Sequence, residues 1–495
     1  MVFSSVEFLF LFLPVFLAVI FLTKDKYQNA LLLLLSLLFY AWGEPKFVFV
    51  LLLSIIWNYM IALLVEKTRE HTLKCKTLLF IGIVVDLGML LLYKYLDVLV
   101  HDFNVLTSSN YNSLNLALPI GISFFVFQEI SYILDVYFQV VPAERNIISV
   151  ALYISFFPKL LMGPIMRYRD FRPQLANRNI DLEHLSVGIK RFITGMVKKV
   201  ILSAPFGIIV DDAFSRTGSD LPVALAWIAL PCYCLQLYFD FSGYSDMAIG
   251  LGKMCGFEIP ENFDYPYLAT SISEYWRRWH ITLGVWFKDY LYTPLFRFLM
   301  RRKNPVTREK YSLQTCDLLA LGVTWICTGI WHGAGSSFLF YGLWYYIFIA
   351  WERIRDARRK KLVKQGKRKK APPTAVERVS GHITTLIIVL CGQLLFRSNG
   401  VLQAFAYVKA MLGLQGNPLV DRTTILYLQD NLVYFVVGII FTTPIVSRVR
   451  AAMQRAHGRQ LIYQATLPVI YAVAFVIAIA FAVSGQQTSF IYFQF

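Results

Sequence analysis

The stretch "LLALGVTWICTGIWHGAGSSFLFYGLWYYIFIAW", from Leu318 to Trp351, contains no Asp, Glu, Lys or Arg. Asp317 precedes it and Glu352 follows it. Since an apolar run of roughly 20 residues can cross a bilayer, this stretch predicts helix embedded in a membrane. His332, within "TGIWHGAG", lies near its middle. A charged imidazole would be most costly there, so the reason for this histidine is the main question that the sequence raises.

Comparable apolar runs recur along the whole chain, which is 57% hydrophobic and 16% aromatic over 495 residues. We count about eleven runs long enough to span a bilayer, some of which we expect to be re-entrant or interfacial. They lie near 5–22, 27–42, 46–65, 77–100, 117–138, 147–166, 186–210, 221–250, 317–350, 383–396, and 431–447 with 460–484. The sequence predicts an all-α integral membrane protein in which residues 1–495 form a single multi-pass domain.

The net charge of +17 is concentrated in short loops between the runs. The clearest is "ERIRDARRKKLVKQGKRKK" at 352–370, within a predicted basic cytoplasmic loop over 352–375. This distribution is typical of the positive-inside bias and argues against nucleic-acid binding. Loop 101–116 has no Lys or Arg, so we place it outside, with 66–76 and 352–370 in the cytoplasm and both termini outside.

Two apolar runs carry features that interrupt helices. In "FFPKLLMGPIMRYRDFRPQL" (156–175), prolines and a glycine predict broken backbone, which survives at membrane depth only where protein buries it or where it lines a cavity. In "YFDFSGYSDMAIGLGKMCGF" (238–257), Asp240 and Asp246 occur among glycines and serines. These carboxylates either face a cavity or bundle interior, or bond backbone amides and hold a break in shape.

The stretch "SISEYWRRWHITLGVWFKDYLYTPL" (271–295) predicts an interfacial helix that begins near Ile272. Ser271 and Glu274 have the spacing of a capping box, and Glu274 lies four residues before Arg278. Continued helix would place Trp276, His280 and Phe287 on one face. His280 is then either an interfacial histidine packed between aromatic rings or a functional group.

For His332 the residues alone leave a structural and a catalytic role equally open. The neighbouring glycines bare the backbone, so another molecule could approach closely. Burial in an apolar environment favours the neutral imidazole, the form that a general base must take. The motifs of serine hydrolases, P-loops, dinucleotide folds and zinc proteases are absent from the sequence. The seven cysteines favour neither a disulfide framework nor a metal site.

Several long motifs, in order, resemble the membrane-bound O-acyltransferase family, in particular its bacterial branch that acetylates alginate and peptidoglycan; teichoic acid D-alanyl transferases are more distant. The resemblance covers nearly the whole chain. It is carried by "MVFSSVEFLFLFLP", "LPIGISFFVFQEISYILDVYF", "FPKLLMGPIMRYRDF", "YFDFSGYSDMAIGLGKMCGFEIPENFDYPYLATSISEYWRRWHITLGVWFKDYLY", "TGIWHGAG" and "FIYFQF".

The resemblance implies a ring of helices around a central catalytic funnel, in a multi-pass protein of the bacterial cytoplasmic (inner) membrane. His332 then corresponds to the catalytic histidine, with His280 assisting by orientation or by a hydrogen bond to the carbonyl. We assign substrate-binding or supporting roles to Trp331, Asp240, Asp246, Trp276, Arg277 and Asp289. No metal and no permanently bound cofactor is expected.

By the same resemblance, the acyl donor is acetyl-coenzyme A or an acyl-carrier thioester, with an acyl carrier protein as a possible partner. The acceptor is an extracytoplasmic acetyltransferase-like partner protein or a glycan, and membrane lipid surrounds the chain. Where many relatives carry His-Gly after "GLW", this chain has Tyr345 and Tyr346. The competing hypothesis is a transporter or flippase of acyl groups or glycan intermediates, in which His332 only lines the path.

Overall fold

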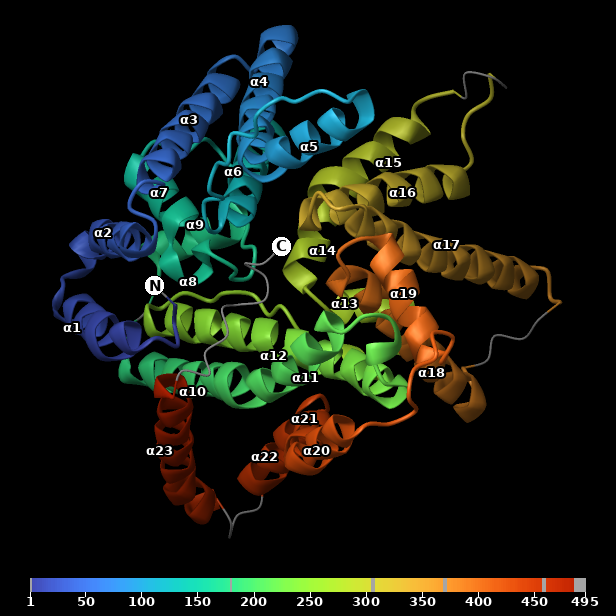
Figure 1. Cartoon of the computed structure of the whole chain (residues 1–495). Coiled ribbons are helices and arrows are strands. Elements are labelled where there is room, and N and C mark those ends of the chain that lie inside the picture. The colour runs from blue at the N-terminus through green and yellow to red at the C-terminus, as the bar shows by residue number, and fades with distance from the viewer. Residues whose placement is uncertain (1, 179, 304–307, 368–371, 456–459, 485–495) are drawn as a thin grey trace. The chain divides into compact units, whose positions relative to one another are not determined.

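The structure is a computed structural model that describes residues 2–178, 180–303, 308–367, 372–455 and 460–484 (Figure 1). Within these ranges the chain is helical, with one isolated bridge between Lys303 and Lys310 in place of any strand. The prediction of an all-α protein is therefore confirmed. The chain forms two compact units, the first built from 1–200, 241–261 and the described residues from 473 to 484, the second from 201–240 and 262–472.

The helices of the first unit are η1 (Phe8–Phe12), α1 (Leu13–Leu22), α2 (Asp25–Gly43), α3 (Val48–Lys67), α4 (Thr72–Leu90), η2 (Leu91–Tyr95), α5 (Leu96–Thr107), α6 (Ile122–Tyr137), α7 (Ile147–Ser155), α8 (Phe157–Leu160), α9 (Tyr168–Ala176) and α10 (Leu182–Val197). Three helices contribute residues to both units: η3 (Lys198–Ser203), α12 (Val223–Met254) and α23 (Gln460–Val483).

The helices of the second unit are α11 (Ala204–Ser215), η4 (Gly218–Asp220), η5 (Pro266–Leu268), α13 (Ile272–Arg278), α14 (Ile281–Phe287), η6 (Lys288–Tyr292), α15 (Thr293–Met300), α16 (Leu313–His332), α17 (Ser336–Lys364), α18 (Ala375–Arg397), α19 (Val401–Met411), α20 (Arg422–Asp430), α21 (Leu432–Phe441) and α22 (Ile445–Arg455).

Seven described segments are long and apolar enough to cross a membrane, or eight with the pair α20 and α21, which is bent by 55°. They are Val48–Lys67, Thr72–Thr107, Leu182–Ser215, Val223–Met254, Leu313–His332, Ala375–Arg397 and Gln464–Val483. The chain is thus a multi-pass membrane protein, but the count of about eleven is not confirmed. An apolar run is not always one long helix: the run at 147–166, for example, breaks into α7 and α8.

The predicted break in 156–175 is confirmed and lies inside protein. The chain leaves α7 after Ser155, forms one turn in α8, and resumes helix at Tyr168. Every residue from 156 to 166 is buried, including Lys159. Burial of this backbone agrees with the rule that broken helix at membrane depth is shielded by protein; the re-entrant path beside a cavity stays a prediction.

The predicted break in 238–257 is wrong, because α12 continues without interruption to Met254. The glycines there serve close packing against α10 instead. A Cβ on Gly243 would lie 2.7 Å from the carbonyl oxygen of Gly195, and one on Gly250 would lie 2.6 Å from that of Gly188. Small residues let membrane helices approach backbone to backbone. The two glycines of each helix are seven residues apart, and each faces a glycine of the other helix, so these contacts join α10 and α12.

The stretch without charged residues, from Leu318 to Trp351, does not form one continuous span. It folds into two helices, α16 and α17, joined by the turn at Gly333 to Gly335 (Figure 1). Gly329 contacts Gly342, and Gly322 contacts Tyr346, so residue numbers fall along α16 as they rise along the facing positions of α17. The pair is an antiparallel hairpin, and α17 runs on to Lys364, so much of the predicted basic loop at 352–375 is helix.

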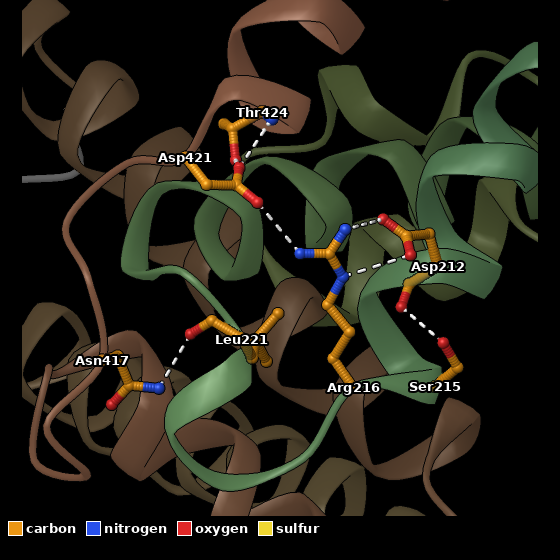
Figure 2. Close-up of polar contacts among 7 residues, drawn as sticks. All are labelled: Asp212, Ser215, Arg216, Leu221, Asn417, Asp421 and Thr424. Carbon is orange, nitrogen blue, oxygen red and sulfur yellow. Dashed lines mark hydrogen bonds and ion pairs between the residues drawn. The ribbon is translucent and has the colours of Figure 1, made fainter.

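Polar contacts in the second unit connect the end of α11 to the segment before α20. Figure 2 shows the Arg216 guanidinium between two carboxylates, 2.7 Å from Asp212 and 3.0 Å from Asp421. Asp421 also accepts a hydrogen bond from the backbone N–H of Thr424 at 2.7 Å and so caps α20. Asn417 donates to the Leu221 carbonyl at 2.7 Å. One arginine thus bridges two chain segments about 200 residues apart.

The glycine packing between α10 and α12 predicts opposite effects for two matched substitutions. Gly195→Ala places a Cβ 2.4 Å from the Gly243 carbonyl oxygen and should lower the free energy of unfolding by about 1–3 kcal/mol. Gly88→Ala on α4 meets no atom within 4 Å and should leave stability unchanged or raise it by up to ~1 kcal/mol. Thermal unfolding of the purified proteins in one detergent compares them, and equal midpoints would contradict the packing argument.

Candidate active site

His332 is the last residue of α16 and is buried, with 5% of its surface exposed. Its ring meets two aromatic side chains edge to face, Tyr341 at 5.6 Å and Phe396 at 5.0 Å between ring centroids. Tyr341 belongs to α17 and Phe396 to α18, and their rings also contact each other. The imidazole is therefore enclosed by rings from two neighbouring helices, which keeps it in a fixed place away from bulk water.

The glycines around His332 make room for the chain's own helix. A Cβ on Gly329 would lie 2.5 Å from the carbonyl oxygen of Phe338, and one on Gly333 would lie 2.4 Å from the Phe338 ring. The expectation that they bare the backbone for another molecule is thus wrong for these two positions, because α17 occupies that space. Only Gly335 has ordinary spacing to its neighbours.

His280 lies at a sharp break between two short helices. Helix α13 begins at Ile272, capped by Ser271, and Arg278 pairs with Glu274 at 2.9 Å, as predicted. The helix does not continue through His280, whose backbone adopts φ 44° and ψ 52°. The shared face with Trp276 and Phe287 is therefore wrong. A left-handed conformation is unfavourable for a residue with a Cβ, and such strain persists only where surrounding contacts impose it.

Asn262 provides those contacts. Its Oδ1 accepts hydrogen bonds from the Thr282 backbone N–H at 3.1 Å and from the Thr282 hydroxyl at 2.9 Å, and it lies 3.2 Å from His280 Nδ1. Its own carbonyl accepts from the N–H of Ile281 at 3.0 Å. A backbone N–H can only donate, so the amide atom facing Thr282 is the oxygen.

The same geometry selects one tautomer of His280. Because Asn262 Oδ1 is an acceptor, Nδ1 carries the proton, and the lone pair of the neutral ring lies on Nε2. Burial lowers the pKa of His280 to about 3, so the ring is neutral near pH 7. In this form Nε2 can accept a hydrogen bond but cannot donate one.

The ring of Trp331 contacts the rings of both histidines. Its ring centroid is 6.2 Å from that of His280 and 4.8 Å from that of His332, its neighbour in sequence. Trp276 belongs to the same aromatic group, at 4.8 Å from both Trp325 and Tyr345 and 6.3 Å from Tyr341. Four residues predicted from the sequence therefore come together within the second unit.

Glu352 anchors the start of α13. Its buried carboxylate accepts hydrogen bonds from the backbone N–H groups of Ile272 at 2.7 Å and Ser273 at 2.9 Å, and from the Ser273 hydroxyl at 2.6 Å. A carboxylate is well placed at a helix N-terminus, where unpaired N–H groups and the helix dipole favour negative charge. Glu352 thus ties α13, which ends two residues before His280, to α17, which carries Tyr341.

The other predicted residues have different settings. Asp240 is buried on the part of α12 in the second unit, Arg277 is exposed on α13, and Asp289 is half-buried on η6. Asp246 belongs to the first unit, where its carboxylate lies 2.6 Å from Arg191 and 2.7 Å from Lys198. Its carboxylate is buried and pairs with cations of neighbouring helices, which fits the expected position in a bundle interior and not the alternative of bonding backbone amides.

Four residues around the histidines did not emerge from the sequence: Asn262, Glu352, Tyr341 and Phe396. Glu352 has one signal in the sequence, since it is the first charge after the apolar stretch, but the sequence predicts a loop at this position. Asn262 lies in "PENFDYP", between helices, where no periodicity reports on packing. Among the described residues, no three His, Cys, Asp or Glu side chains are grouped so that they could hold a metal ion.

Comparisons with known proteins identify the family of this chain. Residues 139–392, which include both histidines, match the MBOAT, membrane-bound O-acyltransferase family. The chain is 38% identical over 409 residues to a probable alginate O-acetylase, AlgI, of Pseudomonas syringae, covering 81% of this chain and 73% of the relative. It is 41% identical over 361 residues to the Pseudomonas putida protein of the same name, covering 71% of each.

A third relative, the peptidoglycan O-acetyltransferase of Helicobacter pylori, is 31% identical over 448 residues, covering 84% of this chain and 80% of the relative. The family match spans the segment that carries His280 and His332, and the relatives align along most of the chain. The chain therefore belongs to the membrane-bound O-acyltransferase family and is a multi-pass acyltransferase.

Proposed function

We propose that this protein moves an acetyl group from a cytoplasmic thioester, acetyl-coenzyme A or an acyl carrier protein, to a hydroxyl of an extracytoplasmic acceptor. The result is O-acetylation of an exopolysaccharide or cell-wall glycan at the bacterial cytoplasmic membrane, directly or through an acetyltransferase-like partner protein. The observation that carries the proposal is the pair of buried histidines whose rings both contact Trp331. The activities named for the relatives, on alginate and on peptidoglycan, support a glycan as the final acceptor.

In this proposal His332 is the general base. The acceptor hydroxyl gives its proton to the imidazole as its oxygen attacks the thioester carbonyl carbon. The carbon–sulfur bond then breaks, and the thiolate takes the proton from the imidazolium, so that atoms and charges balance over the cycle. Proton transfer of this kind contributes typically ~10²–10⁴-fold to a rate. The ring enclosure by Tyr341 and Phe396 supports this role, because it fixes the imidazole and excludes water.

In this proposal His280 acts as a hydrogen-bond acceptor. Because Nδ1 donates to Asn262, Nε2 cannot donate to the thioester carbonyl, and of the two expected modes of assistance the geometry favours orientation over a bond to the carbonyl. Nε2 can accept a hydrogen bond from the acceptor hydroxyl and so turn its oxygen toward the thioester. Arg277, exposed on α13, Asp289 and Asp240 stay as proposed binding or supporting residues.

Removal of the His332 imidazole tests its role as the general base. We expect His332→Ala, reconstituted in vesicles with labelled acetyl-coenzyme A and alginate or peptidoglycan fragments, to transfer label ~10²–10⁴-fold more slowly than the parent. His101→Ala, which changes an exposed histidine on α5, is the matched control and should keep the parental rate. Size-exclusion profiles and unfolding midpoints check that each variant folds. If His332→Ala transfers label at the parental rate, the protein is a conduit in which another component performs the chemistry.

An amide side chain at position 280 tests the two ring nitrogens of His280 separately. His280→Asn replaces Nδ1–H by an amide N–H that can still donate to Asn262, and asparagine tolerates the left-handed backbone at this position. It lacks an atom at Nε2, so we expect a normal unfolding midpoint and a fall in transfer rate of about 10²-fold. Transfer by His280→Asn at the parental rate would show that only the anchor to Asn262 matters and would remove Nε2 from the mechanism.

A further inference from the structure

Two carboxyl groups lie inside the helices of the first unit, apart from any residue used above. Asp86 belongs to α4 and Glu129 to α6, and their exposed fractions are 1% and 0%. Asn58 and Ser54 on α3 complete the group, with 0% and 7% exposed. Helices α3, α4 and α6 pack against one another, and Asp86 lies within the apolar span Thr72–Thr107.

Each carboxyl group has one hydrogen-bond donor from the chain. The Ser54 hydroxyl lies 2.7 Å from Glu129 Oε1, and Asn58 Nδ2 donates to Asp86 Oδ1 at 2.9 Å. Asn58 Nδ2 also donates to the Ser54 carbonyl at 3.1 Å, which fixes the orientation of the amide. Among the described residues, the remaining oxygens, Glu129 Oε2, Asp86 Oδ2 and Asn58 Oδ1, are buried without any hydrogen-bond partner.

The cationic side chains Lys159 and Arg145 near these helices bind groups other than Asp86 and Glu129. Lys159 on α8 donates to the Gln128 side chain and to the Tyr153 carbonyl. Arg145, before α7, pairs with Glu66 at the end of α3. No ion pair to Asp86 or Glu129 occurs within the part of the chain that the structure describes.

The other titratable groups near these helices also have defined contacts. On α9, Arg172 lies 3.6 Å from Glu144, and Tyr168 donates to Glu144 at 2.9 Å. The Tyr132 hydroxyl of α6 accepts from the Glu144 N–H, and the Tyr153 hydroxyl of α7 donates to the Met166 carbonyl. Asp135 of α6, Arg169 of α9 and Lys94 of η2 each have an interaction of their own.

Two ionised carboxylates in this setting would be strongly unfavourable. Burial of an anion inside a membrane protein requires a cation or several donors, and these groups have one donor each. A metal ion fits the site poorly, since hard cations take six or more oxygen ligands and three oxygens are available. A proton on each carboxyl removes both charges and turns two of the three unpaired acceptors into donors, one of which can serve Asn58 Oδ1.

We propose that Asp86 and Glu129 form a proton-binding site within the helices of the membrane domain, with both carboxyls protonated at neutral pH. The inference stands on the first unit alone and is independent of the reaction at His332. Its ligand is the proton, and its chain-derived supports are the Ser54 hydroxyl and the Asn58 amide.

Infrared spectroscopy of the whole protein in lipid nanodiscs at neutral pH tests this site, because protonated carboxyls absorb apart from carboxylates whether or not a reagent can reach them. The parent should show the protonated C=O band, and Asp86→Asn and Glu129→Gln should each remove part of it while keeping the parental unfolding midpoint. Glu66→Gln, which alters a carboxylate paired with Arg145, is the matched control and should leave that band unchanged.

Three results would overturn the proposal: a parent without the band, a band that survives in both variants, or a band that disappears when sodium is added, which would indicate a metal site. If either variant fails to fold, the parent is grown with carboxyl-labelled aspartate or glutamate. The band should then shift in part with each label, and a band that lacks an aspartate or a glutamate component would contradict the site.

Discussion

The contact between Gly329 and Gly342 is the constraint on which the arrangement of the site depends. Each glycine leaves no room for a Cβ beside the other helix: the distances from a Cβ on Gly329 to the Phe338 carbonyl oxygen and from one on Gly342 to the Trp325 carbonyl oxygen are 2.5 and 2.4 Å. Backbones this close fix α16 on α17 in one register. His332, one turn beyond Gly329, is thereby brought to the ring of Tyr341, one residue before Gly342.

From this hairpin the rest of the site is held by polar contacts at the ends of one short helix. Glu352, further along α17, binds the start of α13, and Asn262 holds the break at its other end. A helix of seven residues has little stability of its own, so these two side chains decide where Trp276 and His280 lie. The strained backbone of His280 is the cost of turning its ring toward Asn262 and Trp331.

The features that could be predicted from the sequence are those encoded locally or by long motifs. The all-α membrane class follows from composition, the start of α13 from the spacing of Ser271 and Glu274, and the family from several motifs in order. The rest depends on partners far along the chain. Glu352 caps α13 from a position 80 residues further along the chain, and the break at His280 depends on Asn262. The glycines of α12 resemble a break until Gly188 and Gly195 are seen opposite them.

Acyl transfer by two glycine variants tests most directly whether this backbone contact positions His332. Gly329→Ala places a Cβ against the Phe338 carbonyl oxygen, whereas Gly335→Ala, six residues later in the same hairpin, meets its neighbours only at 3.7 Å or more. The account predicts that Gly335→Ala keeps the parental rate, while Gly329→Ala, although folded, loses at least about tenfold, since small misplacements of catalytic groups are costly. Equal rates for the two folded variants would contradict it.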